Sequence, residues 1–337
     1  MKKPVTLSKI AAACGGISTS TISLALRNSP KIAQATRERI QKTAQELGYS
    51  PNRSLSRTMS EIRTGTQQHY KETLGYITTH PDRFETHIYN GVLQRAQEMG
   101  YNIDRFVVGE SSKEHERLQR NLIARGIRGL IFAPFKQANS TFYLDWQNFA
   151  GVSIGYTLAN PELTRVTRDL DHYARQTFER LEQRGYKRLG FAMEKSHEER
   201  MDHANLAGFL SHQWLQPDSA NLPSPLVRDR LDQSHFVDWF NQYKPDCIVT
   251  MHHLVSEWLS EITGKAKHKV GLFLLNALTA ESKTSGIYPN YELMGARATE
   301  LTASLVERGE FGLPKSAGTL MVKGLWIEGS QIRRKRK

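Results

Sequence analysis

Two short helical patterns separated by a glycine break constrain the fold of the first part of this sequence. Apolar residues recur every three or four positions across Leu7–Cys14 and again across Thr19–Leu26, which is the spacing of one buried helix face. Thr6 and Ser18 precede the two patterns, where an N-cap side chain is needed. Because the Gly15-Gly16 pair interrupts the helices, the stretch predicts a helix-turn-helix unit.

The exposed side of the second helix carries short hydroxyls, one leucine and one cation, which can reach phosphates and base edges. These residues are Thr19, Ser20, Thr21, Ser23, Leu24 and Arg27. A third helical pattern covers residues 32–47 and closes at Gly48. Beyond Pro51, a short segment at residues 54–62 places Leu55 and Met59 on one helical face between arginines.

The positive charge of the chain is concentrated at its two ends. The net charge of the 337 residues is +12. Residues 1–65 hold eleven Lys/Arg against three Asp/Glu, a net +8, and residues 333–337 add +5, so the body is nearly neutral at −1. A basic N-terminal region on a neutral body is typical of a nucleic-acid-binding protein. The basic tail itself is expected to be a solvated end.

The order of these motifs resembles the DNA-binding headpiece of the lac repressor family. The resemblance is carried by Val5-Thr6-Leu7, Gly16-Ile17-Ser18, Thr21–Asn28, Thr36–Ile40 and Leu47–Asn52. It implies a dimeric bacterial repressor with a headpiece at residues 1–53, a hinge helix and linker at 54–72, and an effector-binding core at 73–332. Family members usually have one glycine before the Ile/Val-Ser, so the second glycine here predicts a longer turn.

The resemblance also implies which side chains contact a pseudo-palindromic operator. Thr19, Ser20 and Leu24 would read bases in the major groove. The residues expected at phosphates, at sugars and elsewhere on the DNA are Thr6, Ser18, Thr21, Ser23, Arg27, Asn28, Thr36, Arg37, Tyr49, Asn52 and Arg53. In the family a hinge-helix leucine wedges into the minor groove. The aligned residue is Thr58, but apolar wedges unstack bases, so Met59 is the preferred wedge, with Leu55 second.

After a polar linker, apolar strand patterns alternate with amphipathic helices from Leu74–Thr78 to Gly318–Val322. This alternation predicts parallel sheets covered on both faces. Nearly 260 residues exceed the needs of one sheet, so two lobes resembling a periplasmic binding protein are expected. The first would comprise residues 73–160 with 290–318, and the second residues 161–288.

A small-molecule effector is expected between the lobes, because open α/β sheets bind ligands at the carboxyl ends of their strands. The candidate residues are Thr79, His80, Tyr156, Asn205, His252 and Asn276. Sugar-binding members of the family commonly have Arg at the Asn205 position, Asn-Asp at Met251-His252 and Asp at Asn276. Since this chain lacks those anchors, plain hexoses are expected to bind poorly.

Three catalytic signatures are absent from the sequence: the metalloprotease His-Glu-x-x-His, the P-loop and the dinucleotide fingerprint. An enzyme is therefore not expected. Neither a cofactor nor a metal site is expected, and Ser196–Arg200 is interpreted as a solvated loop. The adjacent His252 and His253 should diverge. Cys14 and Cys247 are far apart in sequence and lie in apolar patterns, as expected of reduced core residues.

The N-terminus lacks the apolar stretch of a signal peptide, so a cytoplasmic protein is expected. Two alternatives differ from a DNA-binding regulator. One is a cytosolic two-lobed protein that binds a small molecule without a DNA role, and the basic N-terminal region argues against it. The other is an intracellular enzyme with an appended headpiece, and the lack of a catalytic constellation argues against it.

Overall fold

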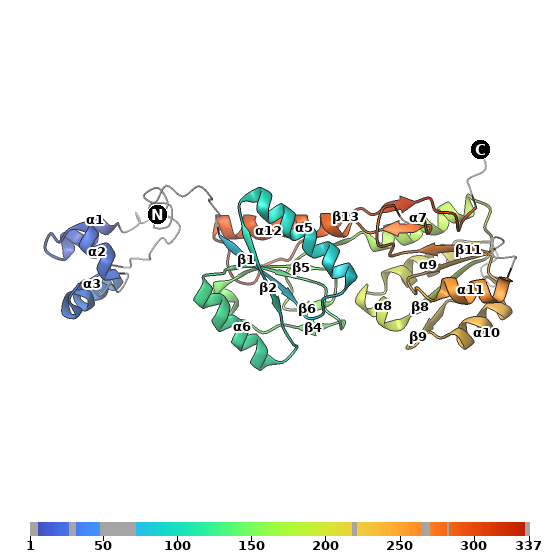
Figure 1. Cartoon of the computed structure of the whole chain (residues 1–337), viewed down its shortest axis with the longest axis horizontal. Coiled ribbons are helices and arrows are strands. Elements are labelled where there is room, and N and C mark those ends of the chain that lie inside the picture. Colours follow the sequence, from blue (N-terminus) through green and yellow to red (C-terminus); the bar gives the residue numbers. More distant parts are fainter. Residues whose placement is uncertain are drawn as a thin grey trace. The chain divides into compact units, whose positions relative to one another are not determined.

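The computed structural model describes residues 6–26, 32–47, 72–217, 221–264, 270–281 and 283–333, and Figure 1 shows them in sequence colours. The chain divides into two compact units, residues 1–69 and 70–337. The expected hinge helix at residues 54–62 and the last four residues of the basic tail lie outside the described residues.

The N-terminal unit is helical, as the sequence predicts. Its described helices are α1 (Leu7–Ala13), α2 (Thr19–Leu26) and α3 (Gln34–Glu46). Their apolar faces meet in a small core formed by Ile10, Ala11, Ile22, Ala25, Ile40 and Ala44. The side-chain amide of Gln41 donates to the carbonyl oxygen of Ala25 at 3.1 Å, so α3 also satisfies a backbone acceptor at the end of α2.

The turn between α1 and α2 depends on both glycines. Gly15 and Gly16 have φ angles of +85° and +81°, in the left-handed region. The amide of Gly16 donates to the Ala11 carbonyl at 2.9 Å, and that of Gly15 donates to the Ala12 carbonyl at 3.2 Å. This pair of bonds is the Schellman arrangement that ends many helices. The second glycine therefore completes the helix end.

Replacing Gly16 by Ala should destabilise this turn by about 1 kcal/mol, because a Cβ atom is unfavourable at a positive φ. Asn at the same position tolerates the left-handed conformation, so Gly16→Asn is the matched control. Amide hydrogen exchange of α1 and α2 in the full chain measures the difference. We expect roughly fivefold faster exchange in Gly16→Ala than in Gly16→Asn, and equal rates would contradict the role of the glycine.

In the described part of the chain, the C-terminal unit contains two six-stranded sheets and one small sheet of two strands. The first sheet has the spatial order β13 (Thr319–Val322), β7 (Thr164–Arg168), β5 (Ala150–Ile154), β3 (Gly129–Phe132), β1 (Thr73–Thr78) and β2 (Asn102–Val107). All of its neighbouring strands pair in parallel. In the register of β1 and β3, Tyr76 lies beside Ile131.

Helices cover both faces of the first sheet, as its apolar strands predict. The helices α5 (Arg83–Met99) and α12 (Tyr291–Arg308) pack over Tyr76, Ile131 and Val152. The helix α6 (Ser112–Arg125) covers the opposite face through Leu118 and Leu122. Smaller elements complete this lobe: β4 (Ser140–Thr141), the 3-10 helix η1 (Trp146–Asn148) and β6 (Leu158–Asn160).

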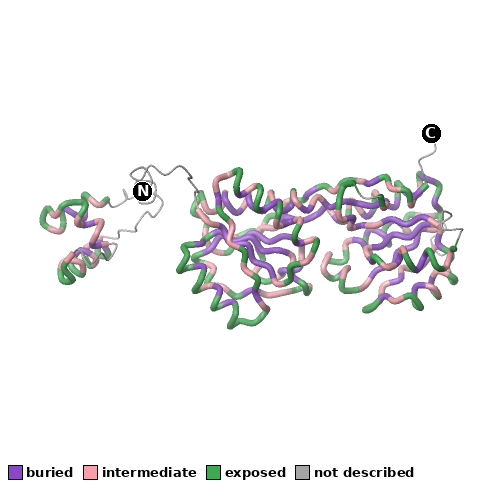
Figure 2. Tube along the Cα trace, viewed as in Figure 1, coloured by how far each residue is buried: buried purple, intermediate pink, exposed green. Residues whose placement is uncertain are grey.

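The second sheet has the order β14 (Leu325–Ile327), β12 (Gly286–Tyr288), β11 (Gly271–Leu274), β10 (Cys247–Thr250), β8 (Leu189–Glu194) and β9 (Leu226–Arg228). Only the pair of β12 and β14 is antiparallel among its described strands. One face is covered by α7 (Leu170–Glu182) and α9 (Ala204–Trp214), and the other by α10 (Gln233–Tyr243) and α11 (Val255–Thr263). The buried residues in Figure 2 follow the strands of both sheets.

The boundaries of the two lobes differ from those that the sequence predicts. Residues 164–168 form β7 in the first sheet, whereas they were expected in the second lobe. Likewise, β14 returns the chain to the second sheet after β13. A search for apolar runs does not detect these two strands, because β7 contains charged residues and β14 is short. The first lobe therefore comprises residues 73–168 and 291–322, and the second residues 169–290 and 323–333.

The helices α5 and α12 approach each other through two glycines. A Cβ atom on Gly91 would lie 1.9 Å from the Glu292 carbonyl oxygen, and one on Gly295 would lie 2.1 Å from the Ile88 carbonyl oxygen. Side chains of any size would separate the two backbones. The first lobe is thus held together by a helix from residues 83–99 in direct backbone contact with one that follows some 190 residues later.

Candidate functional site

The exposed side of α2 has the hydroxyls that the sequence places there. Ser18, Thr19 and Ser20 are exposed, whereas Thr21, Ser23 and Leu24 are half-buried. The Ser18 hydroxyl accepts from the Thr21 amide at 3.2 Å and so caps the helix, as expected. It also lies 2.8 Å from the hydroxyls of Ser20 and Thr21, so these three side chains order one another. Thr19 stands beside them at the first position of the helix.

The other described candidates for DNA contact lie at helix starts. Thr6 caps α1, where its hydroxyl accepts from the Lys9 amide at 3.4 Å. Thr36 and Arg37 are half-buried in the first turn of α3. The remaining candidates lie outside the described residues: Arg27, Asn28, Tyr49, Asn52, Arg53, Leu55, Thr58 and Met59.

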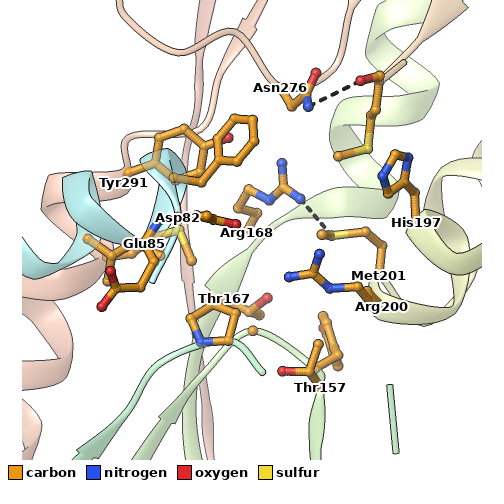
Figure 3. Close-up of a pocket in the computed structure, with 17 residues that line it drawn as sticks. Asp82, Glu85, Thr157, Thr167, Arg168, His197, Arg200, Met201, Asn276 and Tyr291 are labelled. Carbon is orange, nitrogen blue, oxygen red and sulfur yellow. Dashed lines mark hydrogen bonds between the residues drawn. The ribbon is translucent and has the colours of Figure 1, made fainter. Parts of the chain in front are cut away.

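A separate cavity of about 110 Å³ lies between the two lobes. The first lobe contributes the start of α5, the residues after β3 and β5, the end of β7 and the start of α12. The second lobe contributes α8 (Lys195–Arg200) and the residues that follow β10 and β11. The strand ends of both sheets thus surround the space, which is where open α/β sheets bind ligands. Figure 3 shows these side chains converging on it.

Two arginines from opposite lobes dominate the chemistry of the cavity. Arg168, at the end of β7, is 9% exposed and donates to the Leu275 carbonyl oxygen at 3.4 Å. Its guanidinium also contacts the Met201 sulfur. Arg200 comes from α8, and its Nε is buried without a hydrogen-bond partner. Burial lowers the pKa of both guanidiniums, and that of Arg168 falls further because Arg200 is near.

Acidic groups lie near the cavity without forming ion pairs with its two arginines. Asp82 caps α5 by accepting from the Glu85 amide at 2.8 Å, and its charge raises the pKa of Arg200. Glu85 forms an ion pair with Arg105. Glu198 is fully buried and accepts from the Leu206 amide at 2.9 Å. Among the described residues, neither Arg168 nor Arg200 has a carboxylate oxygen within ion-pair distance.

Of the six residues expected at an effector, Tyr156 and Asn276 line the cavity. The ring of Tyr156 lies 5.0 Å beneath the Arg165 guanidinium, and the Asn276 amide donates to the Met251 carbonyl at 3.4 Å. Thr79 and His80 do not line it. The Thr79 hydroxyl accepts from the Lys136 amide, and His80 is exposed.

Asn205 and His252 are buried behind the cavity wall. Asn205 donates to Glu198 at 3.0 Å. His252 faces Glu194, with Nε2 3.6 Å from Oε1, and burial lowers its pKa. The rings of His252 and His253 stack at 5.4 Å, so the expected divergence is wrong. The two residues lie in a turn between β10 and α11, where the geometry of a regular element does not apply.

The interpretation of Ser196–Arg200 as a solvated loop is also wrong. These residues form α8, in which Glu198 is fully buried and His197 and Arg200 line the cavity. Burial lowers the pKa of His197, whose Nδ1 has no hydrogen-bond partner. The local sequence is uniformly polar, so only the fold shows that its charges are buried. Arg168 was missed for the same reason.

The sequence of the headpiece matches the model of "Bacterial regulatory proteins, lacI family" over residues 6–52. The regulator CelR of Thermobifida fusca is 30% identical over 185 residues, which are 54% of this chain and about half, 53%, of that protein. The regulator MalR of Staphylococcus xylosus is 22% identical over 316 residues, 90% of this chain and 92% of that protein. The lacI family model thus matches the N-terminal region of the chain, and relatives named as transcriptional regulators align with the rest.

The structure of the chain also resembles solved transcriptional regulators in its fold. A lac repressor dimer bound to operator and the anti-inducer ONPF has a TM-score of 0.55 at 16% identity, covering 98% of this chain and 99% of that one. The predicted helix-turn-helix region and α/β core with parallel sheets are thereby confirmed. The relatives are named as transcriptional regulators and not as enzymes, in agreement with the expectation from the sequence. Across the described residues, no helix is long and apolar enough to cross a membrane.

Proposed function

We propose that this chain is a sequence-specific DNA-binding transcriptional regulator, and specifically a repressor, that binds a pseudo-palindromic operator as a dimer in the cytoplasm. The observation that carries this proposal is the exposed hydroxyl face of α2 on a helix-turn-helix unit with a net charge of +8 over residues 1–65. A small molecule in the inter-lobe cavity would change the affinity for DNA. The operator-bound dimer of lac repressor, a structure of the same fold, supports the dimeric arrangement.

The roles within the headpiece follow from this proposal. Thr19, Ser20 and Leu24 of α2 would face base edges, since the second helix of such a unit enters the major groove. Thr6, Thr36 and Arg37 lie at the first turns of their helices, where backbone amides and side chains together suit phosphates. Residues 54–72 would form the hinge and linker, with Met59 or Leu55 as the minor-groove wedge.

Gel-shift titration against genomic promoter fragments tests the function. One fragment should bind far more tightly than a scrambled sequence of equal length, because specific sites exceed non-specific ones by a factor of about 10³ or more. Equal binding of all fragments would overturn the proposal. The fragment that binds also provides the operator for the experiments below.

Replacing Ser20 by Ala should lower operator affinity about thirtyfold, because each of the two subunits loses one hydrogen bond of roughly 1 kcal/mol. Binding to scrambled DNA should not change, because the cations that hold phosphates remain. Ser8→Ala, at an exposed position of α1, is the matched control. Ser18 is unsuitable for this comparison because it caps α2. A loss that is equal on operator and scrambled DNA would exclude a base-reading role for Ser20.

A further inference from the structure

The two arginines of the cavity, Arg168 and Arg200, are expected to destabilise the protein when no ligand is bound. Like charges on Arg168 and Arg200 lie in one partly dehydrated space, and Asp82 is the only carboxylate among the described lining residues that is not engaged by another cation. Removing a charge from water without a partner costs several kcal/mol. Such a cost is expected at a binding site, where the missing partner is the ligand.

The contacts of the two arginines do not provide that partner. Arg168 has one long bond to a carbonyl and a contact with a sulfur, whereas a guanidinium has five donors. The Nε of Arg200 is buried and unpaired. In Figure 3 both guanidiniums extend into the same space between the lobes. Planar guanidiniums match carboxylate and phosphate groups with paired hydrogen bonds.

The other residues that line the cavity suit the uncharged part of a small organic anion. Phe84, Tyr291 and Met294 provide an apolar side, while Thr157 and Asn276 offer hydrogen bonds. We propose that the effector of this regulator is a small organic anion whose carboxylate or phosphate bridges Arg168 of one lobe and Arg200 of the other. This inference rests on the proposed function, since it names the ligand class of the same cavity.

Calorimetry with matched sugars tests the ligand class. The probes are glucose, glucuronate and glucose 6-phosphate, which share one ring and differ in the charged group. At least one anion should bind ten- to a hundredfold more tightly than glucose, as expected for hydrogen bonds to charged groups. The preferred anion distinguishes a carboxylate from a phosphate ligand. Binding of glucose as tightly as both anions, or binding of neither anion, would overturn the inference.

Variants of Arg200 test whether this side chain binds the anion or only stabilises the fold. Arg200→Gln should weaken the bound anion about tenfold or more and leave glucose unaffected, whereas Arg175→Gln, an exposed position on α7, should change neither. Arg200→Met should also raise the Tm of the unliganded protein by a few degrees, because it removes a half-buried guanidinium whose Nε has no hydrogen-bond partner. A lowered Tm together with unchanged anion binding would show that Arg200 is structural.

Operator binding in the absence of any sugar keeps the two proposals distinct. If wild-type protein selects an operator but binds no anion, the effector inference fails and the regulator remains. If no operator is selected but an anion binds at the arginines, the proposed DNA function fails instead. Arg200→Gln should lose the change in operator affinity that the anion causes in the wild-type protein.

Discussion

Operator affinity should fall on the order of a thousandfold when salt rises from ~50 to ~200 mM. Each phosphate that a lysine or arginine neutralises releases bound counterions, so log K falls by about 0.9 per contact for every tenfold rise in salt. Residues 1–65 carry eleven Lys/Arg, and a dimer presents two copies of them. A gel-shift or fluorescence titration at four salt concentrations gives the slope directly.

The Arg37→Gln variant should reduce that slope by about one for each subunit, because its cation in the first turn of α3 is expected at a phosphate. Arg297→Gln, on α12 of the core, is the control and should keep the wild-type slope. An affinity that does not depend on salt would contradict DNA binding through the basic headpiece.

Replacing Gly295 by Ala should destabilise the core by about 3 kcal/mol, the upper end of the range for overpacked interiors. The added Cβ atom would overlap the Ile88 carbonyl oxygen, which is backbone and cannot rotate away. Alanine is the better helix former by about 1 kcal/mol, so the crowding must exceed that gain. For a unit of this size, thermal unfolding should show a Tm lowered by roughly 6–12 °C.

Gly318→Ala serves as the control, since a Cβ atom there meets no other atom within 4 Å. Gly91→Ala, on the opposite helix of the same contact, should behave like Gly295→Ala. If both interfacial variants unfold at the wild-type temperature, α5 and α12 do not pack as closely as described.

Periodic apolar patterns made most of the fold predictable. The strand at Leu74–Thr78 and the helix that ends before Gly100 follow from a buried run and from a glycine in the left-handed conformation. The strand β7 was missed because it carries arginines and threonines instead of an apolar run. In the sheet it lies between β5 and β13, and β13 follows it some 150 residues later in the sequence. Local pattern cannot show that environment.

The candidate site was predictable only in part, for a related reason. The hydroxyls of α2 fall on one face of a helix, so their grouping is visible in the sequence. The cavity instead joins residues from both lobes, and its charged members Arg168 and Arg200 lie in polar segments that look solvated. The rule that ligands bind at the ends of strands correctly predicted that Tyr156 and Asn276 lie at the cavity. They also indicated His252, which turns away toward Glu194.

The contact between α5 and α12 determines when the first lobe can finish folding during synthesis. The first lobe begins at β1 but is covered by α12, and the residues of the second lobe up to 290 emerge between β7 and that helix. At ~5–20 residues per second, roughly 6–24 s of synthesis separate the end of β7 from the start of α12. During that time the sheet face around Tyr76, Ile131 and Val152 lacks the part of its cover that α12 provides. Most strands of the second sheet are thus synthesised before α12 can pack on the first sheet. A chain that stops before residue 291 would expose an apolar surface prone to aggregation.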